Sequence, residues 1–392
     1  MNICFVTMQF PAPTEAFASN DLLSLSKMNN SISIFGLKFN HKRHFQMIND
    51  RGLEGINISN ISFKNLFISI LHPAKFFYLF FLIIKMEYKK PNQIVKNILL
   101  IPSSISTYKK IEKLNPDIVH LFWGHYPVLV GYLLRRYANH LPVTIFLGAY
   151  DLEMDLALSN YFAKKAEVVF THSEVNINAL LKKDIKRKNI KVIHRGVDIN
   201  LIDRTIKHIK KVPMKVLSAG RLIKEKNFKN VLKVFADLHK FESNFDLEIV
   251  GSGPEKLKLE KLAKKMKVHD NVTFTSHLSQ IDLFRRMAES EYFIFLSNKK
   301  SERLPNVLKE AMQCGCVCIS SKTKGIEELM QHGVNGFTMS DFNPHDVRKY
   351  FLLSDNEKRN IIRQAKEIIY KKFNLIKSST TYHEIWQELI SQ

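Results

Sequence analysis

Short runs rich in Val and Ile alternate with stretches of helical periodicity along almost the whole chain of 392 residues. Runs of this kind are typical of buried strands in a parallel sheet that carries helices on both faces. The predicted strands are Ile3–Thr7, Ile32–Gly36, Ile118–Phe122, Val143–Phe146, Val168–Thr171, Lys191–His194, Lys215–Ala219, Asp246–Val250, Val272–Thr275, Tyr292–Leu296 and Val317–Ser320. The alternation predicts an α/β fold with two doubly wound, Rossmann-like domains that face a central cleft.

A polar and basic segment, Asn200–Val212, separates the two series of predicted strands, and Pro213 precedes the next one. We therefore expect domains at residues 1–205 and 213–373, with a hinge between them. The last segment, 374–392, has Tyr382, Trp386 and Ile390 at helical spacing. Its helix could stay on the second domain or pack back on the first.

Basic residues outnumber acidic ones by 59 to 37, which gives a formal net charge of +22. Such a surplus suits nucleic acid, an anionic membrane surface or an anionic small substrate. The lysines are spread along the chain, and we find no helix-turn-helix signature, RNA-binding aromatic motif or zinc spacing. A nucleic-acid-binding protein is therefore the least favoured of the three hypotheses.

The cysteines and the first residues bear on the compartment. Cys314, Cys316 and Cys318 alternate in one short run and Cys4 stands apart, a pattern typical of reduced, buried thiols rather than disulfides or a metal site. The first residues lack the basic and apolar regions of a signal peptide. We expect a cytoplasmic protein.

The most apolar stretch is Phe76–Ile84, far shorter than the roughly 20 residues that span a bilayer. It predicts either a helix packed in the core or a helix at the surface of an anionic membrane. The lysines around it are Lys75, Lys85, Lys89, Lys90, Lys96, Lys109, Lys110 and Lys113.

The segment SERLPNVLKEAMQCG, 301–315, carries two carboxylates, Glu302 and Glu310, with seven residues between them. Pro305 suits the first turn of a helix that contains Glu310. The free backbone N–H groups of Leu304, Asn306 and Val307 would then form an anion site. Because carboxylates accept hydrogen bonds from hydroxyls, this combination suits a sugar diphosphate.

A second segment, SAGRLIKEK, follows the predicted strand that ends at Ala219. Gly220 lets the backbone approach a ligand closely. Arg221 and Lys226 are cations that can neutralise a diphosphate leaving group.

Together, these two segments resemble the retaining glycosyltransferases of family 4, which have the GT-B fold. The resemblance continues through the rest of the second domain. It covers VIHRGVDIN (192–200), LEIVGSGPE (247–255), VTFTSHLS (272–279) and GIEELMQHGVNGF (325–337).

The resemblance implies catalytic roles for Glu302, beside the donor sugar, and for Arg221 and Lys226, on the diphosphate. Donor binding is implied for Gly220, Gly251, Gly253, Leu278, Leu304, Pro305, Asn306, Val307 and Glu310, with Glu310 on the ribose hydroxyls. It implies a UDP- or GDP-sugar donor, no cofactor and no metal. No acidic D-x-D motif competes for that work.

The first domain is similar to family members that build bacterial surface polysaccharides. FPAPTEAFASND (10–21) matches their opening loop, HLFWG (120–124) a strand end, and GAYDLEM (148–154) an H-G-Y-D segment. The acceptor-side candidates are Thr14, Glu15, His120, Asp151 and Arg303.

Two departures from the family pattern stand near the candidate site. Gly148 replaces the usual His, for which His120 or His125 could substitute. Arg303 replaces a small residue, and we expect it to point to solvent or to bind an acidic sugar or acceptor. His120 could instead cap a backbone group, and Asp151 a helix N-terminus.

The predicted function is retaining transfer of a hexose from a nucleotide-sugar to a glycan acceptor, lipid-linked at the inner face of the cell membrane, in surface polysaccharide biosynthesis. A carboxylate near the anomeric carbon fits a front-face return of the acceptor or a nucleophile equally. A nucleotide-sugar 2-epimerase of the same fold is the alternative enzyme.

Overall fold

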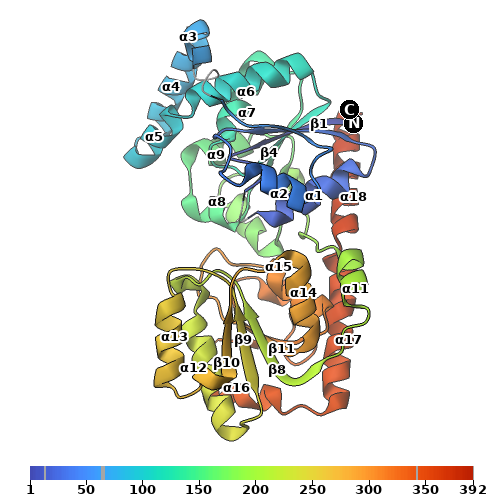
Figure 1. The fold of residues 1–392 in the computed structure, drawn as a ribbon. Helices are drawn as coiled ribbons and strands as arrows, with labels where there is room; N and C mark the ends of the chain where they lie inside the picture. Colours follow the sequence, from blue (N-terminus) through green and yellow to red (C-terminus); the bar gives the residue numbers. More distant parts are fainter. Residues whose placement is uncertain (13–14, 63–66, 341–342, 392) are drawn as a thin grey trace. The chain divides into compact units, whose positions relative to one another are not determined.

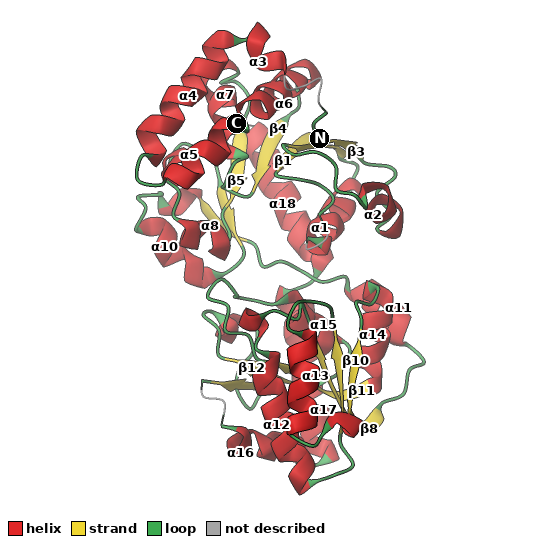
Figure 2. Cartoon of the chain, turned by 60° about the vertical axis from the view of Figure 1, so that its left-hand side comes forward, coloured by secondary structure: helices red, strands yellow, loops and turns green. Residues whose placement is uncertain are grey.

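The computed structural model describes all residues except 13–14, 63–66, 341–342 and 392. It divides the chain into two compact units. Unit 1 comprises Met1–His194 and Ile376–Gln392, and unit 2 comprises Arg195–Leu375. Each unit is a parallel sheet with helices on both faces, which confirms the predicted α/β architecture (Figures 1 and 2).

The sheet of unit 1 has seven parallel strands in the order β3-β2-β1-β4-β5-β6-β7. Their bounds are β1 Asn2–Thr7, β2 Ser31–Gly36, β3 Asn57–Ser59, β4 Ile118–Phe122, β5 Val143–Phe146, β6 Val169–Thr171 and β7 Ile190–Val192. The strand order reverses between β1 and β4, so the loops that follow these two strands diverge. A divergence of this kind is where doubly wound sheets bind ligands.

Both faces of this sheet are buried. On β1, Cys4 and Val6 belong to one apolar cluster, whereas Ile3 and Phe5 belong to the other. The helices of unit 1 are α1 Ala16–Ser26, α2 His44–Asp50, α3 Ile68–Leu71, α4 Pro73–Glu87, α5 Pro91–Ile98, α6 Ile101–Leu114, α7 Val128–Tyr137, α8 Ala149–Met154, α9 Ala157–Ala163, α10 Ile177–Leu181 and α18 Leu375–Ile390. The run of apolar residues in each strand follows from this double cover.

The C-terminal helix α18 packs on unit 1, one of the two arrangements that the sequence left open (Figure 1). Trp386 is fully buried, and its ring lies against those of Phe5, His120 and Phe170. Its indole N–H donates to Thr144 Oγ1 at 3.3 Å. The aromatic spacing of the last segment therefore supplies core contacts to the first sheet.

Unit 2 has a six-stranded parallel sheet in the order β10-β9-β8-β11-β12-β13. The strands are β8 Val212–Ala219, β9 Asp246–Val250, β10 Val272–Thr275, β11 Ser290–Phe295, β12 Val317–Ser321 and β13 Phe337–Met339. The helices are α11 Ile199–Ile206, α12 Phe228–Phe241, α13 Lys256–Lys265, α14 Gln280–Glu289, α15 Asn306–Gln313, α16 Pro344–Val347 and α17 Asp355–Lys372. Here the order reverses between β8 and β11.

The predicted hinge at Asn200–Val212 is wrong in position. Much of this segment is α11, which Asp198 caps by accepting from the Leu201 N–H at 2.9 Å. Ile199 and Ile202 are buried among unit 2 residues, so the basic residues hid an amphipathic helix. The chain instead passes between units at 194–195 and 375–376.

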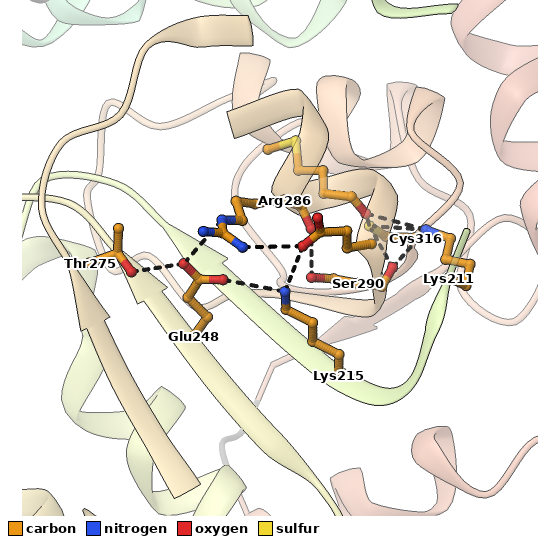
Figure 3. Close-up of polar contacts among 9 residues, drawn as sticks. Lys211, Lys215, Glu248, Thr275, Arg286, Ser290 and Cys316 are labelled. Carbon is orange, nitrogen blue, oxygen red and sulfur yellow. Dashed lines mark hydrogen bonds and ion pairs between the residues drawn. The ribbon is translucent and has the colours of Figure 1, made fainter. Parts of the chain in front are cut away.

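Charged side chains hold neighbouring strands of unit 2 together (Figure 3). Lys211 Nζ donates to the carbonyl oxygens of Ser290 at 2.6 Å and Met287 at 3.2 Å. Glu248 on β9 lies 3.6 Å from Lys215 Nζ and accepts from Thr275 Oγ1 at 2.7 Å. Part of the basic surplus therefore stabilises the sheet itself.

Candidate active site

The centre of the candidate site is an ion pair between Lys226 and Glu302. Lys226 lies in the loop after β8 and Glu302 in the loop after β11, the two neighbouring strands at which the order of the sheet reverses. Lys226 Nζ is 2.6 Å from Glu302 Oε2, and the two side chains are 16% and 15% exposed. The sheet topology thus brings together two predicted catalytic residues that are far apart in the sequence.

Three neighbours hold this pair in place. Ser297 Oγ lies 3.3 Å from both Glu302 Oε2 and the Glu225 carbonyl oxygen. Asn298 N–H donates to the same carbonyl at 2.8 Å, and the Lys226 ammonium lies over the Phe295 ring. An ammonium has three donors, so Lys226 keeps donor capacity beyond its bond to Glu302.

Arg221 is exposed directly after β8, at the same edge of the sheet. Within the described ranges, no ion pair of its side chain is recorded. Gly220 N–H donates to the Val250 carbonyl at 3.0 Å, which continues the pairing of β8 with β9 past the strand ends. The backbone that carries Arg221 is therefore firmly placed, while its guanidinium is open to solvent.

Gly251 and Gly253 allow the loop after β9 to pack against the loop after β8. A Cβ at Gly251 would lie 1.9 Å from the Gly220 carbonyl oxygen, and one at Gly253 would lie 2.4 Å from that of Leu222. Both distances are shorter than any real contact. The structure thus gives these glycines a packing role, and their contact with a nucleoside stays a prediction.

Helix α15 begins at the same edge, as the sequence predicts. Pro305 is the N-cap, and its carbonyl accepts from the N–H groups of Leu308 and Lys309. The N–H groups of Asn306 and Val307, in the first turn, have no acceptor within the helix. Leu304 and Pro305 are buried, whereas Asn306 and Val307 are partly exposed, so the predicted anion site at this helix end rests on the latter two N–H groups.

Glu310 lies one turn further along α15, partly buried against α14. Gln280 Nε2 donates to Glu310 Oε1 at 3.0 Å. Burial raises the pKa of the Glu310 carboxyl. In the loop between β10 and α14, Leu278 is partly buried, and the His277 N–H donates to Ser252 Oγ at 3.3 Å.

One of the two expectations for Arg303 was that its side chain points to solvent, and this expectation is wrong. The residue is buried, and its guanidinium donates to the carbonyl oxygens of Lys300 and Glu302. Thr323 Oγ1 donates to the Arg303 carbonyl at 3.1 Å. Arg303 thus folds back on its own loop and holds the backbone of Glu302, and its contact with an acidic sugar or acceptor stays a prediction.

Two residues of α15 that the sequence analysis did not single out fasten this helix within unit 2. The ammonium of Lys309, which is buried, donates to the Arg195 carbonyl at 2.8 Å and to Asn306 Oδ1 at 3.0 Å. Gln313 Nε2 donates to Asp203 Oδ1 on α11 at 2.8 Å. Asn306, Lys309 and Gln313 are polar residues at i, i+3 and i+7 on one side of α15. This spacing is the sequence pattern from which the two residues could have been predicted.

In unit 1, Asp151 joins the loops that follow β4 and β5. Its Oδ1 accepts from the N–H groups of Gly124 at 3.0 Å and His125 at 3.2 Å, and from His125 Nδ1 at 2.8 Å. Its Oδ2 accepts from the Gly148 N–H at 3.0 Å, which caps α8. The buried carboxylate is therefore an organiser of the site, and it orients His125.

The prediction that His120 faces the acceptor is wrong. The residue is 1% exposed, its Nδ1 lies 2.9 Å from Thr144 Oγ1, and α18 covers its face of the sheet. Burial lowers the pKa of His120 to about 3, which keeps the ring neutral. His125, three residues past the end of β4, does lie at the carboxyl edge, and its side chain is 15% exposed.

The position of Gly148 is closed to a larger side chain. A Cβ there would lie 2.9 Å from Trp123 Cζ3 and 3.2 Å from Phe146 Cε1. Trp123 has a φ of 97°, a strained value for this residue type. A side chain at 148 would therefore require the Trp123 ring to shift.

The opening loop of unit 1 is held by residues that the sequence did not reveal. Arg51 Nη1 donates to the Ala12 carbonyl at 3.0 Å, and Asn60 Nδ2 to the Phe10 carbonyl at 2.6 Å. Glu15, at the N-cap of α1, is partly exposed. Thr14 lies outside the described residues.

Comparisons with known proteins agree with this arrangement. The family profile described as "Glycosyl transferases group 1" matches residues 201–368, and that described as "Glycosyltransferase Family 4" matches 82–201. Together these matches span most of the chain. No helix in the described residues is long and apolar enough to cross a membrane.

Three curated relatives illustrate the range of similarity. An uncharacterised glycosyltransferase of Methanocaldococcus jannaschii is 29% identical over 60% of this chain, a match that spans only 62% of that relative. The N-acetyl-alpha-D-glucosaminyl L-malate synthase of Bacillus anthracis is 27% identical over 70% of this chain and 76% of its own. The amylovoran biosynthesis glycosyltransferase AmsK of Erwinia amylovora is 22% identical over 86% of each chain.

Solved structures show the same fold. Anabaena HepE, in complex with UDP, superposes with a TM-score of 0.74 at 16% identity, over 99% of this chain and 100% of its own. A sucrose-phosphate synthase of Thermosynechococcus elongatus reaches 0.72 at 15% identity, over 100% and 99% of the two chains.

The fold and the two family matches define a glycosyltransferase of the GT-B type. Within that class, residues 82–201 match Glycosyltransferase Family 4, and the chain is related to enzymes of exopolysaccharide biosynthesis.

Proposed function

We propose that the chain is a retaining hexosyltransferase that binds a UDP- or GDP-sugar on unit 2. The observation that carries this proposal is the Lys226–Glu302 pair, at 2.6 Å, on the carboxyl edge where the strand order reverses. Binding of UDP and UDP-glucose by Anabaena HepE, which has the same fold, supports a nucleotide-sugar donor.

The described residues suit departure of a nucleoside diphosphate. The bond between the anomeric carbon and the diphosphate oxygen breaks, and negative charge collects on the leaving oxygen. Arg221, Lys226 and the first N–H groups of α15 supply positive charge or donors at this edge, which is the work that a metal ion performs elsewhere. We therefore propose a metal-independent reaction.

Glu302 and Glu310 have separate proposed tasks. Glu302 lies beside the anomeric carbon, where it serves either a front-face return of the acceptor oxygen or a covalent intermediate. In the front-face route the acceptor oxygen bonds to the anomeric carbon as the diphosphate leaves, and its proton passes to the departing diphosphate oxygen. In the covalent route the Glu302 carboxylate first displaces the diphosphate, and the acceptor oxygen then displaces Glu302 and gives its proton to the diphosphate. Glu310 accepts hydrogen bonds from the ribose hydroxyls.

For the acceptor, we propose a lipid-linked glycan at the cytoplasmic face of the cell membrane, as a step in building a surface polysaccharide. The names of AmsK and of the putative colanic acid biosynthesis glycosyltransferase WcaL of Escherichia coli support this assignment. Unit 1 offers the Asp151–His125 pair at its carboxyl edge for an acceptor hydroxyl.

The test begins with thermal unfolding in the presence of UDP, GDP, ADP and their sugars. A ligand at about 100 times its Kd adds ~2.7 kcal/mol of stability, which is easily detected. The stabilising donor is then incubated with lipid-linked acceptors, with and without EDTA, and the product is analysed by NMR. A product whose sugar keeps the anomeric configuration that it has in the donor supports retention. Release of a 2-epimerised sugar without transfer would instead establish the epimerase.

A further inference from the structure

Helix α4 has two apolar faces, and only one of them is covered. Leu79 and Ile83 are fully buried in the unit 1 core, and Glu87 accepts from the Leu158 N–H at 3.0 Å. Phe77, Phe81, Ile84 and Tyr88 point outward and are 40–66% exposed. Their spacing of i, i+4, i+7 and i+11 places them on one side of the helix. We call these four residues the outer row.

The elements on either side of α4 are also apolar and exposed. Figures 1 and 2 show α3, α4 and α5 together on the outside of unit 1. Ile70 and Leu71 of α3 are 72% and 76% exposed, and Leu99, which ends α5, is 70% exposed. Scattered apolar residues are normal on a surface, whereas a cluster of this size marks an interaction site.

The charges beside the outer row are positive. Residues 67–100 contain five lysines and a single acidic residue, Glu87, which is buried. Lys85, Lys89 and Lys96 are exposed, and within the described chain none of them forms a recorded ion pair. Two copies of this face brought together would bring like charges together, which disfavours self-association through it.

We propose that α4 is an interfacial helix whose outer row enters the headgroup region of an anionic bilayer, with Lys85, Lys89 and Lys96 on the lipid phosphates. Aromatic and aliphatic residues on one side of a helix, flanked by lysines, suit such a position. The inner face keeps α4 fastened to unit 1, so the helix lies along the membrane rather than across it. This inference deepens the proposed function, because it identifies the surface that would bring unit 1 to a lipid-linked acceptor.

The test is sedimentation of the full chain with vesicles of phosphatidylcholine alone or mixed with phosphatidylglycerol, at low and high salt. We expect binding only to the mixed vesicles, weakened by salt. Since each lysine near an anionic surface contributes about fivefold in affinity, K85Q/K89Q/K96Q should lower the binding about 100-fold. F77S/F81S should reduce it at least tenfold even at low salt, because the apolar insertion is lost.

Matched controls come from unit 2. K261Q/K264Q/K265Q removes the same charge from exposed positions of α13, and L257S removes an exposed apolar side chain beside lysines. Both controls should bind like the unaltered chain. Equal losses in the control and test variants would overturn the proposal, as would binding to neutral vesicles alone. If the chain instead dimerises and F77S/F81S abolishes the dimer, the partner of the outer row is a second copy of the chain and not a bilayer.

Failure of this inference can be told apart from failure of the proposed function. The F77S/F81S variant alters none of the proposed donor-site residues, so its stabilisation by the nucleotide should be unchanged. Its transfer to a short, water-soluble acceptor should also be unchanged, while transfer to an acceptor in vesicles falls. If transfer in vesicles is unaffected, the outer row does not dock the enzyme.

Discussion

The ammonium of Lys309 lies 2.8 Å from the carbonyl oxygen of Arg195, the first residue of unit 2. The segment that begins there is paired with the end of the same unit, since Val197 N–H donates to the Phe373 carbonyl at 2.8 Å. Lys309 also lies over the Phe373 ring. The helix that carries Glu310 is thus fastened to the place where the chain enters and leaves unit 2.

The first prediction concerns this contact. Lys309→Met keeps most of the side-chain volume but leaves the Arg195 carbonyl and Asn306 Oδ1 without the ammonium. We expect a loss of about 1–3 kcal/mol in the free energy of unfolding, measured by denaturant titration. Lys261→Met, on the exposed side of α13, should change it by less than about 0.5 kcal/mol. An equal effect in both variants would mean that the buried contact contributes nothing.

The second prediction separates the two members of the central ion pair. Lys226→Met should weaken UDP or GDP binding roughly tenfold or more, because a charged hydrogen bond contributes about 1.5–3 kcal/mol. Glu302→Gln should bind the nucleotide nearly normally while transfer falls about 100-fold or more. Binding is measured by calorimetry and transfer by product formation. Lys224→Met, exposed two residues before Lys226, is the matched control.

The third prediction tests the packing of the two glycine loops. In Gly251→Ala, the new Cβ would meet the Gly220 carbonyl oxygen at 1.9 Å, and backbone cannot yield as a side chain does. We expect destabilisation of about 1–3 kcal/mol, together with weaker nucleotide binding because the loop that carries Arg221 shifts. Gly55→Ala meets nothing within 4 Å and should leave both quantities unchanged. Unaltered stability of Gly251→Ala would show that the loops repack freely.

These contacts also show what the sequence could predict. The longer strands and α15 were predictable because apolar runs and helical periodicity extend over several residues. Strands of three residues are too short to show a period. The strands β6 and β7 were predicted because Val168 and Ile193 extend their apolar runs, whereas the equally short β3 and β13 were not. The hinge was misplaced because the polar and basic residues around them conceal Ile199 and Ile202, the two buried isoleucines of α11.

The errors within the site have a common physical cause. Whether His120 is exposed depends on α18, which reaches β4 from the far end of the chain. Whether Arg303 faces solvent depends on the carbonyl groups of its own loop. Burial at such positions is decided by tertiary contacts, whereas the motifs around Glu302 and Glu310 are local and could be recognised.

The fourth prediction follows from the raised pKa of Glu310. Burial disfavours its charged form in the folded chain, so ionised Glu310 opposes folding. This penalty is absent below the ordinary pKa of the carboxyl, develops as the pH rises from that ordinary pKa to the raised pKa of the folded chain, and is constant above the raised value. Without ligand, Glu310→Gln should therefore melt at a higher temperature than the unaltered chain at pH 7 and equally at pH 3.5.

With bound nucleotide, the unaltered chain should melt at a higher temperature than Glu310→Gln. If Glu310 accepts ribose hydroxyls, the Gln variant loses a charged hydrogen bond and binds UDP or GDP roughly tenfold more weakly. Comparison with the 2′-deoxynucleotide isolates this contact, because the deoxy ligand should be affected less. A variant that is less stable than the unaltered chain at pH 7 would mean that the Gln280 bond outweighs the burial penalty.

The last prediction concerns the four hydrogen bonds of Asp151. In Asp151→Asn, one oxygen can still accept, but the amide nitrogen that replaces the other cannot accept from its N–H partner. We expect a loss of about 1.5–3 kcal/mol in stability, because a buried charged acceptor is replaced. His125 loses its carboxylate partner, so the KM for the acceptor should rise while nucleotide binding to unit 2 is unchanged. Asp155→Asn, which alters an exposed carboxylate at the end of α8, should leave both quantities as they are. If the acceptor KM of Asp151→Asn is unchanged although its stability falls, then Asp151 supports only the fold, and His125 has no part in binding the acceptor.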